Sequence, residues 1–257
     1  MSNKYRTKKR FGQHFLHDHS VIQTLIQYIN PKQDQQIIEI GPGMGALTFP
    51  LLEQLEFMQV IEIDRDVIQH LQQQGGDRLI IHNVDALKFD FKQLLNENQP
   101  LRIVGNLPYN ISTPLIFHLL ESAPHIQDMH FMLQKEVVDR ITAQPSNKTY
   151  GRLSVMVQYH CDTEYLFYVG PEAFSPPPKV NSAVLRLQPW QQKPYLANDI
   201  KLFSQVVTQA FSMRRKTLRN TLKKLLTIKQ IEAIGIDTGL RPENLSVKDY
   251  VALSNLL

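Results

Sequence analysis

The sequence predicts an α/β fold in which a parallel sheet is followed by a small all-helical domain. The sheet is predicted by short apolar runs that suit buried strands and that alternate with segments of helical periodicity. The helical domain is predicted by the absence of any such run beyond a proline-containing linker at 188–194. We therefore expect two domains, residues 1–190 and residues 197–257. The expected strands in the first half are 37–40, 60–64, 79–82 and 101–104, and the expected C-terminal helices are 202–211, 216–226, 229–234 and 247–256.

The remaining elements complete this pattern. Apolar residues at helical spacing predict an amphipathic helix over 21–29, just before the first strand. After Ser112 we expect a helix that is capped by Ser or Thr and that ends near Ser122. Further strands are expected at 129–133 and 154–161, a helix at 135–141, and a late edge strand at 182–187.

Composition bounds the class of protein. The chain has 257 residues, of which 42% are hydrophobic, and it contains no apolar run long enough to span a membrane. Charges near the N-terminus are not followed by an apolar core, so we expect no secretory signal. Cys161 is the single cysteine, which suits a reducing cytoplasm, and its apolar surroundings indicate an ordinary strand residue rather than a nucleophile.

A glycine-rich loop follows the first expected strand. Gly41, Gly43 and Gly45 occur at a spacing of two, and a helical pattern begins at Ala46. Glycines at this place let the backbone turn tightly and let a ligand lie against bare N–H groups. The spacing differs from the G-x-G-x-x-G of dinucleotide-binding loops, and Pro42 lies inside it, so a pyrophosphate ligand is the weaker interpretation.

Two acidic residues follow the next two strands. Glu62 lies at the carboxyl end of its strand, 21 residues after Gly41, where an acidic residue binds a ribose diol in doubly wound sheets. Asp85 follows the third strand, where a carboxylate could accept a hydrogen bond from an adenine amino group. Glycine, Glu and Asp in this order indicate a nucleoside ligand without a phosphate, and S-adenosylmethionine fits this description. We expect a methyl donor at this edge of the sheet.

The tetrapeptide Asn106-Leu107-Pro108-Tyr109 follows the fourth strand. An aromatic amine is a poor nucleophile because its lone pair is delocalised into the ring. Two acceptors, the Asn106 Oδ1 atom and the Leu107 carbonyl, would draw the amine toward tetrahedral geometry while Tyr109 stacks on the ring. Pro108 favours an extended backbone at Leu107, which can direct that carbonyl outward. The alternative is an ordinary strand-to-loop turn, but the donor loops upstream favour methyl transfer to a base nitrogen.

Basic residues are concentrated in two segments. The net charge is only +4, yet residues 1–17 hold five Lys or Arg, among them Lys9 and Arg10, and residues 200–231 hold eight; neither segment contains an acid. Arg215, Arg219 and Lys223 are spaced i, i+4, i+8, so an expected helix would carry them on one face. Like charges at this spacing destabilise a helix, and contact with RNA phosphates explains them better than a merely solvated surface.

Seven segments together give the chain a resemblance to the ribosomal RNA adenine dimethyltransferases, and in particular to those that modify the bacterial small subunit. The resemblance covers nearly the whole chain and is highly specific, because the segments occur in the family's order. This chain has His14 where the family usually has Asn. The segments are KRFGQHFL at 9–16, EIGPG at 39–43, NLPYNIS at 106–112, LQKEV at 133–137, YGRLSV at 150–155, FSPPPKV at 174–180 and RRKTLR at 214–219.

The resemblance implies a Rossmann-like class I S-adenosylmethionine-dependent methyltransferase domain and a small helical RNA-binding domain. It implies that His14 and Leu16 help to hold the donor together with Gly41, Gly43, Glu62, Asp85 and Asn106. It places Phe174 near the target base, as a second aromatic face opposite Tyr109. The reaction implied is dimethylation of two adjacent adenosines in a hairpin loop near the 3′ end of small-subunit (16S) rRNA, in a pre-30S particle. We expect a cytoplasmic monomer without a membrane partner.

Several alternatives remain open. A large-subunit rRNA adenine methyltransferase of the macrolide-resistance type would share the donor site. A DNA adenine methyltransferase would use a similar tetrapeptide, but no separate base-reading domain is evident. A ribosome-assembly factor that acts mainly by binding would not need intact donor loops. A metal site at His14, His17, Asp18 and His19 is disfavoured because no further ligand completes the set, so we expect no metal.

Overall fold

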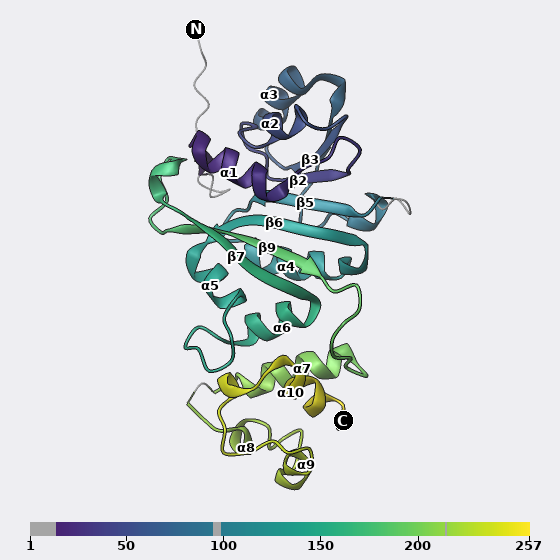
Figure 1. Ribbon diagram of the computed structural model, residues 1–257, viewed down its shortest axis with the longest axis vertical. Coiled ribbons are helices and arrows are strands. Elements are labelled where there is room, and N and C mark those ends of the chain that lie inside the picture. The colour runs from purple at the N-terminus through teal and green to yellow at the C-terminus, as the bar shows by residue number, and fades with distance from the viewer. Residues whose placement is uncertain (1–13, 95–98, 214) are drawn as a thin grey trace. The chain divides into compact units, whose positions relative to one another are not determined.

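The computed structural model describes residues 14–94, 99–213 and 215–257, which form two compact units (Figure 1). Unit 1 comprises Met1–Val138 and Glu164–Pro189, and unit 2 comprises Asp139–Thr163 and Trp190–Leu257. This division differs from the expected boundary near residue 190, because the segment 139–163 belongs with the C-terminal helices. It contains helix α6 (Arg152–His160), which packs against α7 (Ile200–Ala210) and α10 (Val247–Ser254).

A seven-stranded sheet forms the centre of unit 1, with the strand order β4-β3-β2-β5-β6-β9-β7 (Figure 1). The pairs β2–β3, β3–β4, β2–β5 and β5–β6 are parallel, whereas β9 runs antiparallel to β6. The predicted α/β class and its parallel sheet are confirmed. The strands are β2 (Ile37–Ile40), β3 (Met58–Glu62), β4 (Leu79–Asn83), β5 (Leu101–Asn106), β6 (Ile126–Gln134), β7 (Cys161–Val169) and β9 (Ser182–Pro189).

Two expectations about this sheet were wrong. Residues 152–160 form the helix α6 and not a strand, because a short apolar run does not distinguish a buried helix from a strand. Its first turn is fixed locally by Ser154 Oγ, which accepts a hydrogen bond from the Gly151 N–H at 3.0 Å. The strand lies immediately downstream as β7, which takes the edge of the sheet, so β9 is an interior strand rather than the edge strand.

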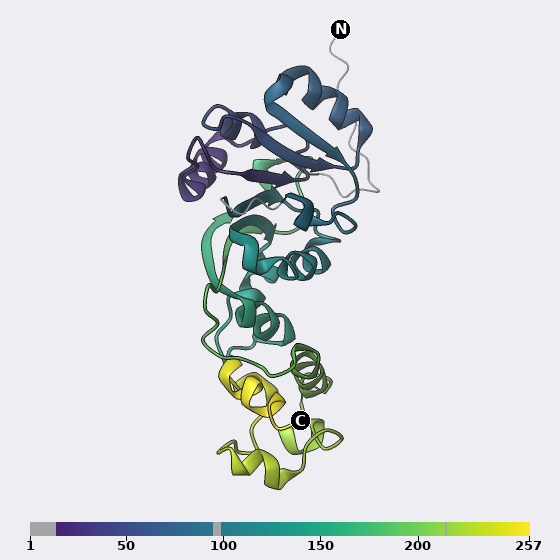
Figure 2. The same cartoon turned by 90° about the vertical axis from the view of Figure 1, so that its right-hand side faces the viewer.

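Helices flank the strands of unit 1. Asp18 caps α1 (His19–Ile29) by accepting from the Ser20 and Val21 N–H groups, and Asp64 caps α3 (Arg65–Gly75) by accepting from the Asp66 N–H group. Helix α3 lies along β3 and β4 (Figure 2). Helix α4 (Ser112–Leu120) lacks the predicted side-chain cap, because Ile111 takes the cap position. Helix α2 (Thr48–Leu52) also belongs to unit 1, whereas α5 (Lys135–Ile141) spans the boundary between the two units in the sequence.

A two-stranded antiparallel ladder ties the beginning of the described chain to a distant loop. Strand β1 (Phe15–Leu16) pairs with β8 (Phe174–Ser175), so that Leu16 lies opposite Phe174. Both of these side chains are buried in the hydrophobic core of unit 1. The ladder holds the segment 14–16 beside the carboxyl ends of the parallel strands.

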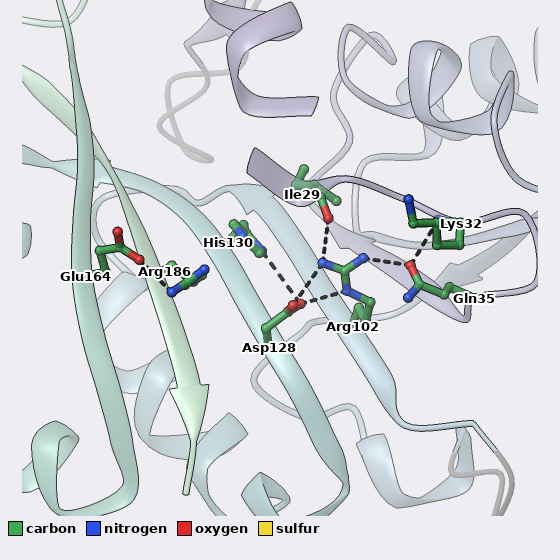
Figure 3. A network of polar contacts seen from close by, with 8 residues as sticks. All are labelled: Ile29, Lys32, Gln35, Arg102, Asp128, His130, Glu164 and Arg186. Atoms are coloured by element: carbon green, nitrogen blue, oxygen red, sulfur yellow. Dashed lines mark hydrogen bonds and ion pairs between the residues drawn. The ribbon is translucent and has the colours of Figure 1, made fainter. Parts of the chain in front are cut away.

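A buried ion pair joins β5 to β6 near the amino ends of these two strands, away from the segment 14–16 (Figure 3). The Arg102 guanidinium donates to both Asp128 carboxylate oxygens, with Nε–Oδ1 and Nη2–Oδ2 distances of 2.9 and 2.8 Å. It also donates to the Ile29 carbonyl and to Gln35 Oε1. Burial lowers the pKa of the neighbouring His130 to about 4, so this imidazole is neutral at pH 7 and forms no ion pair with Asp128.

Unit 2 contains its own helical core. Helix α7 contributes the buried residues Phe203, Val206 and Val207, and α10 contributes Tyr250. The Tyr250 hydroxyl donates to the Pro242 carbonyl at 2.7 Å. Between them lie the short helices α8 (Leu218–Thr221) and α9 (Ile228–Ala233).

Candidate active site

A cavity of about 280 Å³ lies at the carboxyl ends of β2, β3, β4 and β5, wholly within unit 1. The glycine loop, the residues after β3 and β4, and the tetrapeptide 106–109 all line it. The segment His14–Leu16 lines it as well. The structure therefore brings together the donor and tetrapeptide residues that the sequence predicts, in one pocket.

The glycine loop adopts backbone conformations that only glycine accommodates easily. Gly41 and Gly43 have φ angles of +69° and +53°. A Cβ atom at position 43 would lie 2.8 Å from the Phe15 ring, so this glycine is also required by a close approach. Glycine at these positions therefore allows both the turn and the close packing of Phe15 on the loop.

Glu62 lies at the end of β3, as predicted, with its carboxylate largely buried. The side-chain Oε1 accepts from the backbone N–H groups of Ile63 and Asp64 at 2.8 and 2.9 Å. Burial raises the pKa of Glu62, and these hydrogen bonds oppose the increase. A carboxylate held in this way has a fixed direction and is suited to accept from a ligand hydroxyl pair.

Asp85 lies on the loop after β4, and its Oδ1 accepts from the Leu87 N–H at 3.0 Å. Ile63 lines the same part of the pocket although it is 46% exposed. An exposed aliphatic side chain in a pocket that also holds two carboxylates suits the face of a flat aromatic ring. Sequence reasoning missed Ile63, although it directly follows Glu62.

The Asn106 side chain is oriented by the backbone of the segment 14–16. Its Nδ2 donates to the His14 carbonyl at 3.0 Å. Because that carbonyl can only accept, the amide nitrogen must face it, and Oδ1 points the other way. No residue in the described part of the chain donates to Asn106 Oδ1 or to the Leu107 carbonyl, and both residues line the pocket.

Tyr109 is half-buried, and both its hydroxyl and its ring make contacts within the protein. Its hydroxyl forms a 2.6 Å hydrogen bond with Ser182 Oγ, and burial raises its pKa. Its ring lies nearly parallel to the His14 imidazole, with the centroids 6.0 Å apart and an interplanar angle of 25°. The imidazole Nδ1 in turn lies 2.7 Å from the Pro176 carbonyl, to which it donates.

Phe174 is not brought to the pocket. Its side chain is only 2% exposed and packs in the hydrophobic core, and it is absent from the pocket lining. The aromatic residue beside Tyr109 is instead His14. The burial of Phe174 follows from its pairing with Leu16, which directs both side chains into the core.

The predicted basic helix face is not formed. Helix α8 covers only Leu218–Thr221, so Arg215 and Lys223 lie outside it, and the three cations do not share a helix. Arg215, Arg219 and Lys223 are all exposed. Leu218 and Leu222 are buried, but the helix already ends at Thr221. Lys9 and Arg10 lie outside the described residues.

Two further residues of the pocket region were missed by sequence reasoning. Glu39 lines the pocket at the end of β2, and its Oε2 accepts from Thr48 Oγ1 at 2.6 Å. Burial raises the pKa of Glu39 to about 8. Gly105 lies in β5, where a Cβ atom would be 2.5 Å from the Ile40 carbonyl, and a glycine inside a strand pattern is the signal for such an approach.

The described residues offer neither an activated thiol nor a metal cluster. Burial raises the pKa of Cys161 to about 12, so its thiol is not activated. Within the ranges that the structure describes, no three His, Cys, Asp or Glu side chains are grouped closely enough to bind a metal ion. No helix formed by these residues has the length and apolar character to cross a membrane.

Comparison with known proteins gives the family. The model of the family described as "Ribosomal RNA adenine dimethylase" matches residues 4–257. The chain belongs to this family. The "Ribosomal RNA small subunit methyltransferase A" of Alcanivorax borkumensis is 56% identical over 254 residues, which cover 98% of this chain and 91% of the relative.

Solved structures support the same fold. A dimethyladenosine transferase from Plasmodium falciparum superposes with a TM-score of 0.77 at 25% identity, over 93% of this chain and 96% of that chain. The 23S rRNA methyltransferase ErmE superposes with a TM-score of 0.75 at 23% identity, over 95% of this chain and 99% of that chain. The fold is thus shared with a 23S rRNA methyltransferase and does not by itself identify the RNA that this chain modifies.

Proposed function

We propose that this chain transfers methyl groups from S-adenosylmethionine to the N6 atoms of two adjacent adenosines in small-subunit rRNA, forming N6,N6-dimethyladenosine. The target is the hairpin loop near the 3′ end of the 16S rRNA, in a pre-30S particle in the cytoplasm, and the chain acts as a monomer. The choice of the small subunit is supported by the 56% identity to a relative of that name, whereas the likeness to ErmE is one of fold.

The pocket fits the proposed donor. Glu62 offers a fixed carboxylate for the ribose hydroxyls, Ile63 an apolar face for the adenine, and Asp85 an acceptor at the rim. Gly41 and Gly43 leave room for the methionine part against the loop backbone. S-adenosylmethionine supplies a methyl group that the positive charge of its sulfur has already activated, so neither a metal nor a strong base is required.

The single observation that carries the mechanism is the orientation of Asn106. With Nδ2 committed to the His14 carbonyl, Oδ1 and the Leu107 carbonyl remain as acceptors for the two hydrogens of an adenine amino group. Accepting both hydrogens localises the lone pair of the nitrogen for in-line attack on the methyl carbon, where a nitrogen–carbon bond forms as the sulfur–carbon bond breaks and the donor leaves as a neutral thioether. The two oxygens stabilise the positive charge that develops on the nitrogen. The ring of Tyr109 offers its face to the base and to that charge. The surplus proton leaves to water.

The test is methyl transfer to small ribosomal subunits that lack the modification, with labelled donor and mapping of the labelled nucleotides. We expect label on two adjacent adenosines near the 3′ end of the small-subunit rRNA. Label confined to large-subunit RNA would contradict the proposal. Tight binding to small subunits without any transfer would favour an assembly factor.

The donor site has its own test. Glu62→Ala should weaken S-adenosylmethionine binding by about 2 kcal/mol, because charge-assisted hydrogen bonds to the ribose are lost. Titration calorimetry measures the affinity, and a melting curve shows whether the variant is folded. Unchanged affinity in a folded variant would remove Glu62 from the donor site.

A further inference from the structure

An aromatic and basic surface adjoins the pocket on its β9 side, beyond the residues that line it. We name Tyr168, Asn181, Tyr165 and Lys135 the rim cluster. All four lie in unit 1, on the edge strand β7 or at the neighbouring ends of β6 and β9. The most exposed member is Tyr168, whose side chain is 50% accessible although it belongs to a strand.

A short series of contacts connects this cluster to the proposed catalytic residues. The Tyr109 hydroxyl bonds to Ser182, and the preceding residue, Asn181, accepts the hydroxyl hydrogen of Tyr168 at Oδ1, 3.0 Å away. The Asn181 carbonyl accepts from the Lys135 N–H at 2.9 Å. Tyr109 and Tyr168 are thus attached to consecutive residues of one segment. The positions of the Tyr109 ring in the pocket wall and of the exposed Tyr168 ring therefore both depend on the segment 181–182.

Two lysines belong to this part of the chain. The Lys135 ammonium lies 5.8 Å from the centroid of the Tyr165 ring, and the exposed Lys179 is two residues from Asn181 in the chain. Glu164, next to Tyr165 on β7, is neutralised by Arg186 at 2.7 Å. An exposed tyrosine whose hydroxyl is fixed can stack on a base of single-stranded nucleic acid, and lysines on the same part of the chain can meet its phosphates.

We propose that the rim cluster binds the RNA nucleotide next to the adenosine in the pocket, with the base stacked on Tyr168 and a backbone phosphate near Lys179. This inference rests on the proposed function. It gives the second of two adjacent adenosines a defined place while the first reacts. The Asn181–Ser182 peptide joins this surface to the side of the pocket that Tyr109 forms.

The test uses the full-length chain, labelled donor and small subunits that lack the modification. Tyr168→Ala should raise the KM for small subunits about tenfold, because stacking on one base is lost, and should leave donor affinity unchanged. Tyr168→Phe keeps the ring and loses only the bond to Asn181, so its KM should stay within about twofold of wild type. Tyr195→Ala in unit 2 is the matched control, since Tyr195 is also exposed, at 40%.

Salt dependence separates the two contacts. Stacking neutralises no phosphate, so Tyr168→Ala should leave the slope of log affinity against log salt unchanged, whereas Lys179→Ala should make it shallower by about 0.7. An unchanged slope for Lys179→Ala would remove the phosphate contact. A Tyr168→Ala variant with wild-type KM, or a Tyr168→Phe variant as impaired as Tyr168→Ala, would overturn the stacking role. Absence of transfer by the wild-type chain would instead contradict the proposed function and, with it, this inference.

Discussion

The Asn106 amide receives its orientation from a backbone carbonyl, that of His14. A backbone contact does not depend on the side chain at position 14, so the histidine that this chain has there is compatible with an oriented amide. The histidine ring adds a contact of its own with Tyr109. The segment 14–16 thus orients Asn106, in addition to lining the pocket.

The role of Asn106 leads to a prediction at this scale. Asn106→Ala should reduce single-turnover methyl transfer by about 10²-fold, as expected when one preorganised polar group is lost. The affinity for S-adenosylmethionine should change little, because Glu62 and Asp85, the carboxylates proposed to bind it, are on other loops. Rapid-quench measurements give the rate and calorimetry gives the affinity. Rates within about threefold of wild type would show that the amide does not align the amine.

Glu39 leads to a prediction about pH. Burial raises its pKa to about 8 from the ordinary 4.5, so between these values the folded chain holds a proton that the unfolded chain has lost. The contribution of Glu39 to the free energy of unfolding therefore decreases as pH rises through this window. Glu39→Gln should lack this decrease and gain about 1 kcal/mol relative to wild type between pH 7 and pH 9.

Urea denaturation at a series of pH values measures this difference. Glu164→Gln is the control, because Glu164 is a half-exposed partner of Arg186. Parallel pH curves for wild type and Glu39→Gln would show that Glu39 keeps an ordinary pKa in the folded chain.

At the scale of elements, the pairing of β5 with β6 decides where Asn106 lies, because Asn106 is the last residue of β5. The Arg102–Asp128 pair lies at the other end of the same strands, and the side chain of Arg102 is 5% exposed. Asp128→Ala should therefore lower the free energy of unfolding by about 3 kcal/mol, since it leaves a buried guanidinium without its counter-ion.

The Arg186–Glu164 pair provides the comparison for this prediction. It links β9 to the edge strand β7 at the surface, with side chains that are 37% and 47% exposed. Glu164→Ala should cost less than about 1 kcal/mol because water screens the pair. Equal losses for the two variants in urea denaturation would contradict the distinction between a buried and an exposed ion pair.

The parallel half of the sheet and the pocket loops could be predicted because each strand is a short apolar run that ends in residues of distinct chemistry. Gly41, Glu62 and Asn106 each follow such a run. The region 152–169 could not be predicted in the same way. Its apolar residues form a helix, whereas the strand beside it, β7, mixes Asp, Thr and Glu with aromatic residues. The place of Phe174 depends on pairing with Leu16, a contact that no local pattern encodes.

The basic segment of unit 2 shows the same limitation. The spacing of Arg215, Arg219 and Lys223 fits a helix, but only Leu218–Thr221 forms one. The repulsion between like charges at this spacing, which indicated a polyanionic partner, also disfavours a long free helix. The part of the prediction that remains is a group of exposed cations, and RNA binding by these cations needs a test of its own.

At the scale of the whole molecule, replacing Arg215, Arg219 and Lys223 together with Ala should weaken binding to small subunits without altering donor affinity. Each phosphate contact contributes about 0.7–0.9 to the slope of log affinity against log salt, so the triple variant should have a slope shallower by ~2–3. Filter binding over a range of salt concentrations measures it. An unchanged slope would mean that these cations are only solvated, and a lowered melting temperature would indicate a packing role instead.

The ladder between β1 and β8 also determines when the pocket can exist during synthesis. The His14 side chain meets the Pro176 carbonyl across 162 positions of the chain. A nascent polypeptide that has completed β2 to β5 therefore possesses the donor loops but not the closed wall beside Tyr109. Contacts of such long range close late, since a large loop must be ordered first. The catalytic centre of this protein is consequently finished only after residue 176 has been made, well after the strands that carry its chemistry.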